Sequence, residues 1–136
     1  MTDRFDSETV RRYLTSSGVS VTVFDEVDST NRIALELAEG GAPEGTAIVA
    51  ASQTAGRGRL GRSFYSPTGS GIYISVILRP AALPEKAVLL TPAAGVAVCR
   101  AIEGMTSEKA AVKWVNDIYM HDRKVCGILV QSKAES

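Results

Sequence analysis

One stretch of the chain limits its fold more than any other. Residues 53–63 read Gln-Thr-Ala-Gly-Arg-Gly-Arg-Leu-Gly-Arg-Ser. Glycine loses the most conformational entropy when a helix or strand becomes ordered, and closely spaced arginines repel one another. We therefore expect a long glycine-rich loop over residues 54–70, with regular structure on either side of it.

The glycine spacing in this loop matches two phosphate-binding patterns. Gly56, Gly58 and Gly61 satisfy G-x-G-x-x-G, and a P-loop match fails at one position, where Arg62 replaces lysine. Both mechanisms require a helix directly after the glycines, but residues 64–71, Phe-Tyr-Ser-Pro-Thr-Gly-Ser-Gly, begin a helix poorly. We reject both matches. What remains is an anion site made of glycine backbone and guanidinium groups, with a plain surface loop as the alternative.

The charge pattern favours the anion site. The chain has 15 basic and 15 acidic residues among 136. Residues 1–44 carry nine acids and four bases, whereas residues 45–84 carry four arginines, no lysine and no acid. A solvated surface usually mixes lysine with glutamate. The zero net charge and the lack of interleaved aromatic residues make a nucleic-acid surface the weaker alternative.

Composition indicates one small globular domain over residues 1–136. The apolar fraction of 45% excludes a disordered chain, and two cysteines, Cys99 and Cys126, are too few for a disulfide scaffold, so we expect reduced thiols. No run approaches 18 consecutive apolar residues, and the N-terminus has no signal-like core. We therefore expect no membrane span and a cytoplasmic location. We also expect no metal site, because His121 has no second histidine and the cysteines lie far apart.

The pattern of apolar residues predicts helices and strands in an α+β arrangement, a mixed and partly antiparallel sheet with packed helices. We expect Ser7 to cap the first helix and Asp28 or Ser29 the second, while Thr91 caps the third. A hairpin through Asp122 and Arg123 joins the last two strands. The predicted helices are 8–16, 30–39 and 92–103, and the predicted strands are 20–27, 46–53, 71–79, 110–115, 117–121 and 125–131.

In the predicted strand 71–79, side chains alternate between two faces. We expect the face with Ile72, Ile74, Val76 and Leu78 to be core. The opposite face, with Tyr73, Ser75, Ile77 and Arg79, can line a site.

Three further polar positions have two readings each. Lys113 lies in an apolar strand, where a lysine either extends to solvent or points at an anion. Asn116-Asp117 lies at a strand boundary and serves either a turn or a ligand. Ser29-Thr30-Asn31 caps a helix, and its small polar side chains can also hold a polar ligand group.

Five segments in sequence resemble the catalytic domain of the biotin protein ligases. They occur in that family's order and extend over residues 25–131. The segments are Asp28-Ser29-Thr30-Asn31, Gln53-Thr54-Ala55-Gly56-Arg57-Gly58-Arg59-Leu60-Gly61-Arg62, Tyr73-Ile74-Ser75, Lys113-Trp114-Val115-Asn116-Asp117 and Lys124-Val125-Cys126-Gly127-Ile128-Leu129-Val130.

The resemblance implies a fold and a set of site residues. The fold is that shared by class II aminoacyl-tRNA synthetases and biotin ligases, here as the N-terminal part of the catalytic domain, without a winged helix before it or a β-barrel after it. Lys113 and Arg59 would be catalytic. The residues expected to bind biotin or its adenylate are Ser29, Thr30, Asn31, Gln53, Gly56, Arg57, Gly58, Arg59, Arg62, Phe64, Tyr73, Lys113, Asn116, Gly127 and Ile128.

The implied reaction is ATP-dependent, magnesium-assisted activation of biotin to biotinyl-5'-adenylate, followed by transfer to a lysine of a biotin carboxyl carrier domain. Because this match lacks the winged helix of repressor-type members, the resemblance implies no DNA partner. Apolar strands left exposed in so short a domain favour pairing with a second copy, so a homodimer is one expected partner, and the composition predicts no membrane partner. Two alternatives stay open at this point: a lipoate-type ligase, and a non-catalytic module that binds biotin and adenylate without turnover.

Overall fold

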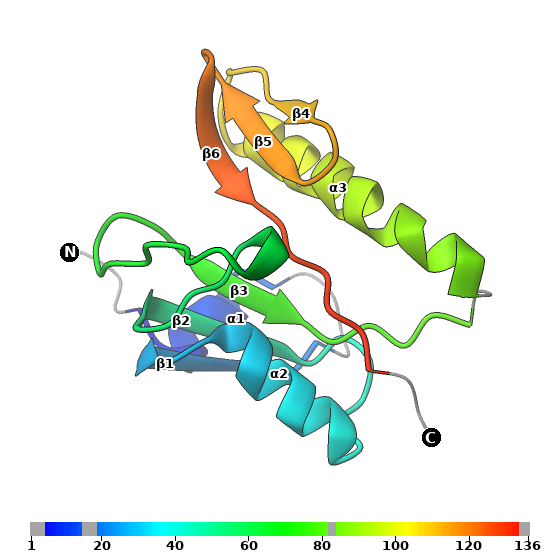
Figure 1. The fold of residues 1–136 in the computed structure, drawn as a ribbon. Coiled ribbons are helices and arrows are strands. Elements are labelled where there is room, and N and C mark those ends of the chain that lie inside the picture. The colour runs from blue at the N-terminus through cyan, green and yellow to red at the C-terminus, as the bar shows by residue number, and fades with distance from the viewer. Residues whose placement is uncertain (1–4, 15–18, 82–83, 134–136) are drawn as a thin grey trace. The chain divides into compact units, whose positions relative to one another are not determined.

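The computed structural model describes residues 5–14, 19–81 and 84–133, which form two compact units (Figure 1). The first unit contains the chain up to Arg57 together with Gly61–Arg79. The second contains the chain from Pro80 onward together with the loop tip Gly58–Leu60. Each unit has its own three-stranded sheet, so the predicted strands divide between two sheets instead of joining one.

The sheet of the first unit is mixed. Strand β1 (Val21–Val27) pairs in parallel with β2 (Ala47–Gln53), and β2 pairs antiparallel with β3 (Tyr73–Val76). The apolar run at the start of β2 is buried on both faces, as an uninterrupted run of small and β-branched residues predicts. Strand β2 is therefore the centre of this unit.

Neighbouring residues of β2 pack in two different clusters. Val49 packs with Val21 and is covered by Val10 of α1 (Ser7–Arg12). Ile48 points to the opposite face and packs with Ala34 of α2 (Thr30–Glu39) and with Ile77. The two-residue repeat of a strand thus gives each helix its own face of the sheet.

The first helix is capped by Asp6, not by Ser7 as predicted. The Asp6 carboxylate accepts a hydrogen bond from the Thr9 backbone N–H at 2.9 Å. The Ser7 hydroxyl instead accepts from the Val23 N–H at 3.0 Å and so ties the helix to β1. The helix ends at Arg12, and the last two residues of the predicted range 8–16 lie outside the described residues.

The second helix has the predicted bounds, and its two candidate caps have different tasks. The Ser29 hydroxyl accepts from the Arg32 N–H, whereas the Asp28 carboxylate accepts from the Ser29 N–H at 2.7 Å and from the Arg32 side chain. At the other end of α2, Nη2 of Arg79 donates to the carbonyl oxygens of Ala38 and Ala42 at 2.7 and 2.8 Å. Side chains therefore bond both ends of α2, and the backbone N–H groups of residues 40–42 also bond carbonyls of its last turn.

The predicted faces of β3 are wrong in one respect. Ser75 lies opposite Ile48, so the face that carries Ser75 and Ile77 is the one that α2 covers, and both residues are buried. The face predicted to be core remains between 51% and 65% exposed, because the cover from α1 extends over β1 and not over β3. Its residues are Ile72, Ile74, Val76 and Leu78.

The second unit packs one helix on an antiparallel sheet (Figure 1). Helix α3 (Leu90–Met105) lies against strands β4 (Ala111–Lys113) and β5 (Asp117–Met120), and β6 (Arg123–Gly127) pairs with β5. A 3-10 helix, Pro84–Leu89, leads directly into α3. Pro92 is consequently the third residue of α3 and Thr91 is not its cap. Proline is tolerated there because N–H groups of the first turn have no partner within the helix.

The hairpin between β5 and β6 turns one residue earlier than predicted. Met120 pairs with Arg123, so the two turn residues are His121 and Asp122. Both have positive φ, 49° and 61°, as a two-residue turn of this type requires. Arg123 is therefore the first residue of β6.

The helical run Glu85–Met105 meets a length and composition test for a membrane span, with a mean hydropathy of 1.4 over its most apolar window. Cys99 of this run is buried within the unit and Gly95 contacts the sheet. Only 11% of this window is buried, and Val88, Leu89 and Met105 are exposed. Length and composition alone are weak evidence for a membrane span. Cys99 and the half-buried Cys126 both carry free thiols, and burial raises the pKa of Cys126.

We expect Gly95→Leu to destabilise the chain by about 2 kcal/mol, through overpacking. A Cβ on Gly95 would lie 3.3 Å from Cγ2 of Val112 and 3.6 Å from Cδ1 of Ile118. Gly104→Leu is the matched control on the same helix, because a Cβ there meets nothing within 4 Å. Urea unfolding measures both. Equal midpoints for the two variants would contradict this account of the packing.

Candidate functional site

A polar cluster forms where β2 ends and α2 begins. The side-chain oxygen Oε1 of Gln53 accepts hydrogen bonds from the backbone N–H and the hydroxyl of Thr30, at 2.9 and 3.1 Å. The Thr30 hydroxyl lies 2.8 Å from that of Ser75, which in turn donates to Oδ1 of Asn31. Three of the predicted biotin-site residues are therefore brought together, and β3 contributes Ser75 to the same cluster.

The cluster follows from the local sequence. Ser29 ends the extended segment after β1 and caps α2, which places Thr30 and Asn31 in the first turn of the helix. Thr30 is buried, and Gln53 is the last residue of β2. Parallel pairing of β1 and β2 sets Val27 beside Gln53, so the chain enters α2 next to that glutamine. The result is a small group of neutral side chains with both donors and acceptors.

The base of the loop between β2 and β3 is a narrow ribbon. Gln53 bridges Ser66, and Arg57 bridges Ser63, both antiparallel. Between these rungs the Phe64 N–H donates to the carbonyl of Gly56 at 2.8 Å. The ribbon keeps both sides of the loop close together.

Gly56 is the point of closest approach in this ribbon. A Cβ built on Gly56 would lie 2.4 Å from Oγ of Ser66, 2.5 Å from the carbonyl oxygen of Phe64 and 2.9 Å from Nε2 of Gln53. No side chain fits there without movement of the backbone. Glycine at this position is thus required by packing, whatever else it contributes.

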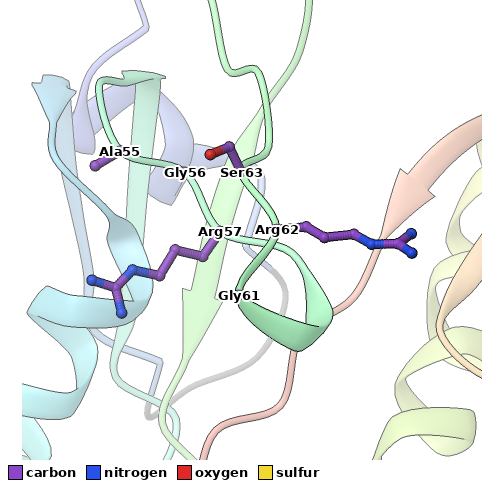
Figure 2. A pocket seen from close by; sticks show the side chains of 6 residues that line it. All are labelled: Ala55, Gly56, Arg57, Gly61, Arg62 and Ser63. Atoms are coloured by element: carbon purple, nitrogen blue, oxygen red, sulfur yellow. The ribbon is translucent and has the colours of Figure 1, made fainter.

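A hollow of about 360 Å³ opens along the loop (Figure 2). Arg57 and Arg62 extend from it in opposite directions, and both side chains are exposed. Among the described residues, neither makes an ion pair or a side-chain hydrogen bond. Their charge is thus available to an anion that the loop would hold. The lining residues are Ala55, Gly56, Arg57, Gly61, Arg62 and Ser63.

At the tip, the chain turns through Leu60 and Gly61, with φ of 58° and 73°. The predicted residues Gly58 and Arg59 belong to this tip, and the Arg59 side chain is exposed.

Phe64 and Tyr73 flank the loop base on its outgoing side. The Tyr73 hydroxyl donates to the carbonyl of Pro67 at 3.0 Å, so it anchors the chain between the loop and β3. Phe64 is partly exposed, and its carbonyl accepts from the Ser66 hydroxyl at 2.9 Å. Both residues therefore shape the loop in this structure, and a ligand role remains a prediction.

The carboxylate beside the cluster is held ionised. The hydrogen bond from the Arg32 side chain, and then that from the Ser29 N–H, lower the pKa of Asp28 below its ordinary value. The same contact raises the pKa of Arg32, which also bonds Glu36 at 2.8 Å. The exposed ion pairs of Arg32 with Asp28 and Glu36 hold the Asp28 carboxylate at the start of α2. The side chains of the polar cluster itself are neutral.

The remaining predicted residues lie in the second unit. The ammonium of Lys113 lies 5.1 Å from the centre of the Tyr119 ring, and no carboxylate pairs with it among the described residues. Asn116 and Ile128 exchange two hydrogen bonds, N–H to carbonyl at 2.8 Å and side chain to carbonyl at 3.2 Å. Gly127 lies opposite Asp117 in the β5–β6 ladder. Asn116 thus fixes the chain after β6, and Lys113 is an exposed cation.

Two serines that contact residues of the polar cluster, Ser75 and Ser66, are not among the predicted biotin-site residues, although Ser75 lies on the strand face predicted to line a site. Ser75 is found by the alternation of β3, which places it on the face toward α2. Ser66 has no such signal, because its partner Gln53 lies 13 positions away across an irregular loop. Only the folded ribbon brings the two together.

Residues 23–136 match the Biotin/lipoate A/B protein ligase family, so the chain belongs to that family. It is 46% identical over 111 residues to the bifunctional ligase/repressor BirA of Bacillus spizizenii, covering 82% of this chain and 34% of that protein. It is 40% identical over 114 residues to BirA of Escherichia coli, with 84% and 35% covered. The biotin--[acetyl-CoA-carboxylase] ligase of Paracoccus denitrificans is 38% identical over 109 residues, with 77% and 44% covered.

Solved structures of biotin protein ligases are also similar to this chain. The biotin protein ligase from Aquifex aeolicus in complex with biotin and ATP has a TM-score of 0.70 and 39% identity, covering 81% of this chain and 45% of that one. The Leishmania major biotin protein ligase with biotinyl-5-AMP has a TM-score of 0.68 and 29% identity, with 84% and 52% covered. The resemblance to biotin protein ligases and the α+β fold class are confirmed. The chain spans about a third of the length of the BirA proteins and about half of the solved chains.

We expect Gly56→Ala to destabilise the chain by about 1–3 kcal/mol, because the new methyl group overlaps Ser66 and the Phe64 carbonyl. Gly40→Ala is the control, since its nearest contact is 3.5 Å away and its φ is −76°. Urea unfolding gives the stabilities, and amide NMR shifts at residues 53 and 66 report the local change. A Gly56→Ala chain as stable as Gly40→Ala would show that the ribbon is not packed as described.

Proposed function

We propose that this chain carries the biotin- and phosphate-binding part of a biotin protein ligase, an enzyme that activates biotin with ATP and transfers it to a lysine of a biotin carboxyl carrier domain. The observation that carries the proposal is the neutral cluster around Gln53, which lies directly at the base of an arginine-rich loop. Relatives that are biotin protein ligases in complex with biotin, ATP and biotinyl-5-AMP support the choice of ligand.

The neutral cluster suits the ureido group of biotin. That group is uncharged and offers both N–H donors and a carbonyl acceptor. Thr30, Asn31 and Gln53, with Ser29 beside them, offer complementary neutral groups, so no buried charge has to be compensated.

The arginine loop suits the other end of the ligand. In the first step, a carboxylate oxygen of biotin attacks the α-phosphorus of ATP, and pyrophosphate leaves. The crowded negative charge is what Arg57, Arg59 and Arg62 would neutralise, since guanidinium groups bind phosphate and carboxylate through paired hydrogen bonds. In the second step, the neutral amine of the acceptor lysine attacks the biotinyl carbonyl, AMP leaves with the bonding electron pair, and the amine nitrogen releases a proton to water.

Lys113 would stabilise charge on the biotin carboxylate and the α-phosphate. Its side chain is exposed, and the Tyr119 ring beside it is the contact that the structure gives to its ammonium. A flexible cation without a carboxylate partner can follow charge as it moves from the carboxylate to the leaving pyrophosphate.

Magnesium is assigned no residue of this chain. The described residues contain no group of three histidine, cysteine, aspartate or glutamate side chains that could hold a metal ion. Magnesium commonly binds through substrate phosphates and water, so it would arrive with ATP.

The proposed location is the cytoplasm, where biotin, ATP and carrier domains meet.

A non-catalytic binding module is the second candidate. The observation in its favour is that the neutral cluster around Gln53 can hydrogen-bond a ligand without a charged group of its own. Isothermal calorimetry with biotin, with lipoate as the comparison, tests ligand binding, and pyrophosphate release with ATP and biotin tests turnover. Binding of biotin with release supports the ligase and binding without release supports the module. Failure to bind biotin would refute both.

We expect Lys113→Ala to slow pyrophosphate release roughly 30-fold while biotin affinity changes less than three-fold. The loss corresponds to one charged contact worth about 2 kcal/mol in the transition state. Lys109→Ala is the control, because Lys109 is also exposed in the second unit but lies outside the five family segments. Release at the parental rate in Lys113→Ala would remove Lys113 from the proposed mechanism.

A further inference from the structure

The side-chain amide of Gln53 is bonded at both of its ends. Its oxygen accepts from the Thr30 N–H at 2.9 Å, and its Nε2 donates to Oγ of Ser66 at 3.1 Å. The Thr30 hydroxyl adds a contact of 3.1 Å to the same oxygen. An amide that is bonded only at one end can rotate, whereas this one has a partner for each end.

Counting protons fixes the direction of the second contact. Ser66 has one hydroxyl hydrogen, which it donates to the carbonyl of Phe64 at 2.9 Å. The Ser66 oxygen must therefore accept from Gln53. A rotated amide would place its oxygen against the lone pairs of Ser66 and its N–H groups against the Thr30 N–H, and both contacts would repel.

Water cannot replace the serine at this point. Ser66 is 3% exposed, and its hydroxyl lies in the tight space that the missing Cβ of Gly56 leaves open. The backbone also holds it in place, because the Gln53 N–H donates to the Ser66 carbonyl at 2.9 Å. Ser66 is thus fixed by the loop ribbon and faces the functional end of Gln53.

We propose that Ser66 is a positioning residue for biotin recognition, which it serves by setting the orientation of the Gln53 amide. With one Nε2 hydrogen on Ser66, the other has no partner among the described residues and is presented at a fixed angle to an acceptor on the ligand. The inference rests on the proposed function, and it adds a residue from the arginine loop to the recognition of the neutral end of biotin. The loop and the cluster are then joined through one hydroxyl group.

Calorimetry with biotin on the full chain tests this proposal. Ser66→Ala should weaken biotin binding about ten-fold, because the amide loses its fixed orientation and the Phe64 carbonyl loses its donor. Ser66→Cys should lie between Ser66→Ala and the parent, since a thiol is a weaker acceptor. Ser70→Ala is the matched control, an exposed serine of the same segment whose hydroxyl lies 3.4 Å from the Pro67 carbonyl. It should bind as the parent does.

A double-mutant cycle separates positioning from general damage. In a Gln53→Ala background, adding Ser66→Ala should change the affinity less than two-fold, because the amide that Ser66 orients is gone. A further ten-fold loss in that background would show that Ser66 acts by another route, and the proposal would be overturned. Parental affinity in both Ser66→Ala and Ser66→Cys would overturn it as well.

An NMR measurement tests the positioning without relying on ligand binding. The chain has two glutamines, Gln53 and Gln131, so the Gln53 side-chain NH₂ pair is identified by its loss in Gln53→Ala. In Ser66→Ala this pair should exchange faster with solvent and become more mobile, while Gln131 is unchanged. A parent chain that binds no biotin would refute the proposed function alone. An unchanged Gln53 signal in Ser66→Ala would refute the role of Ser66.

Discussion

The burial of β2 on both faces is the constraint on which the first unit depends. Because Ile48 and Val49 pack in opposite directions, α1 and α2 each receive one face, and neither can slide without losing its cluster. Gln53 is the last residue of this rigid strand. The polar cluster is therefore built at the end of the strand that is buried on both faces, and the glycine-rich loop begins directly after it.

Local sequence signals predicted most elements of this unit but not all of their partners. Helix α2 has the predicted bounds because Ser29 before its first residue and Gly40 and Gly41 after its last residue are strong local signals. The predicted faces of β3 were wrong because alternation divides a strand into two faces without saying which one a helix covers. Only the register of Ser75 against Ile48 decides this, and register depends on residues distant in sequence.

For the candidate site, too, local sequence signals identified some residues and missed others. Glycines, arginines and helix-cap residues have recognisable chemistry, so the residues and the family resemblance named the loop arginines, Thr30, Asn31 and Gln53, and the structure brings the last three together. Their roles toward a ligand stay predictions. Ser66 was missed because a single serine in a loop has no periodicity and its role depends on a contact across the ribbon. Likewise Thr91 matched a capping pattern, but the 3-10 helix before α3 removed the need for a cap.

The ribbon divides the loop between β2 and β3 into a base and a tip, and these two parts tolerate different changes of sequence. The rungs at Gln53–Ser66 and Arg57–Ser63 fix the length of the base, and Gly56 fills a space that accepts no side chain. In the turn through Leu60 and Gly61 the positive φ of both residues limits the residue type, but no rung between these described residues fixes the length. Insertions and deletions would therefore be tolerated at the tip, where they would change how far the arginines reach, while the neutral cluster below keeps its dimensions.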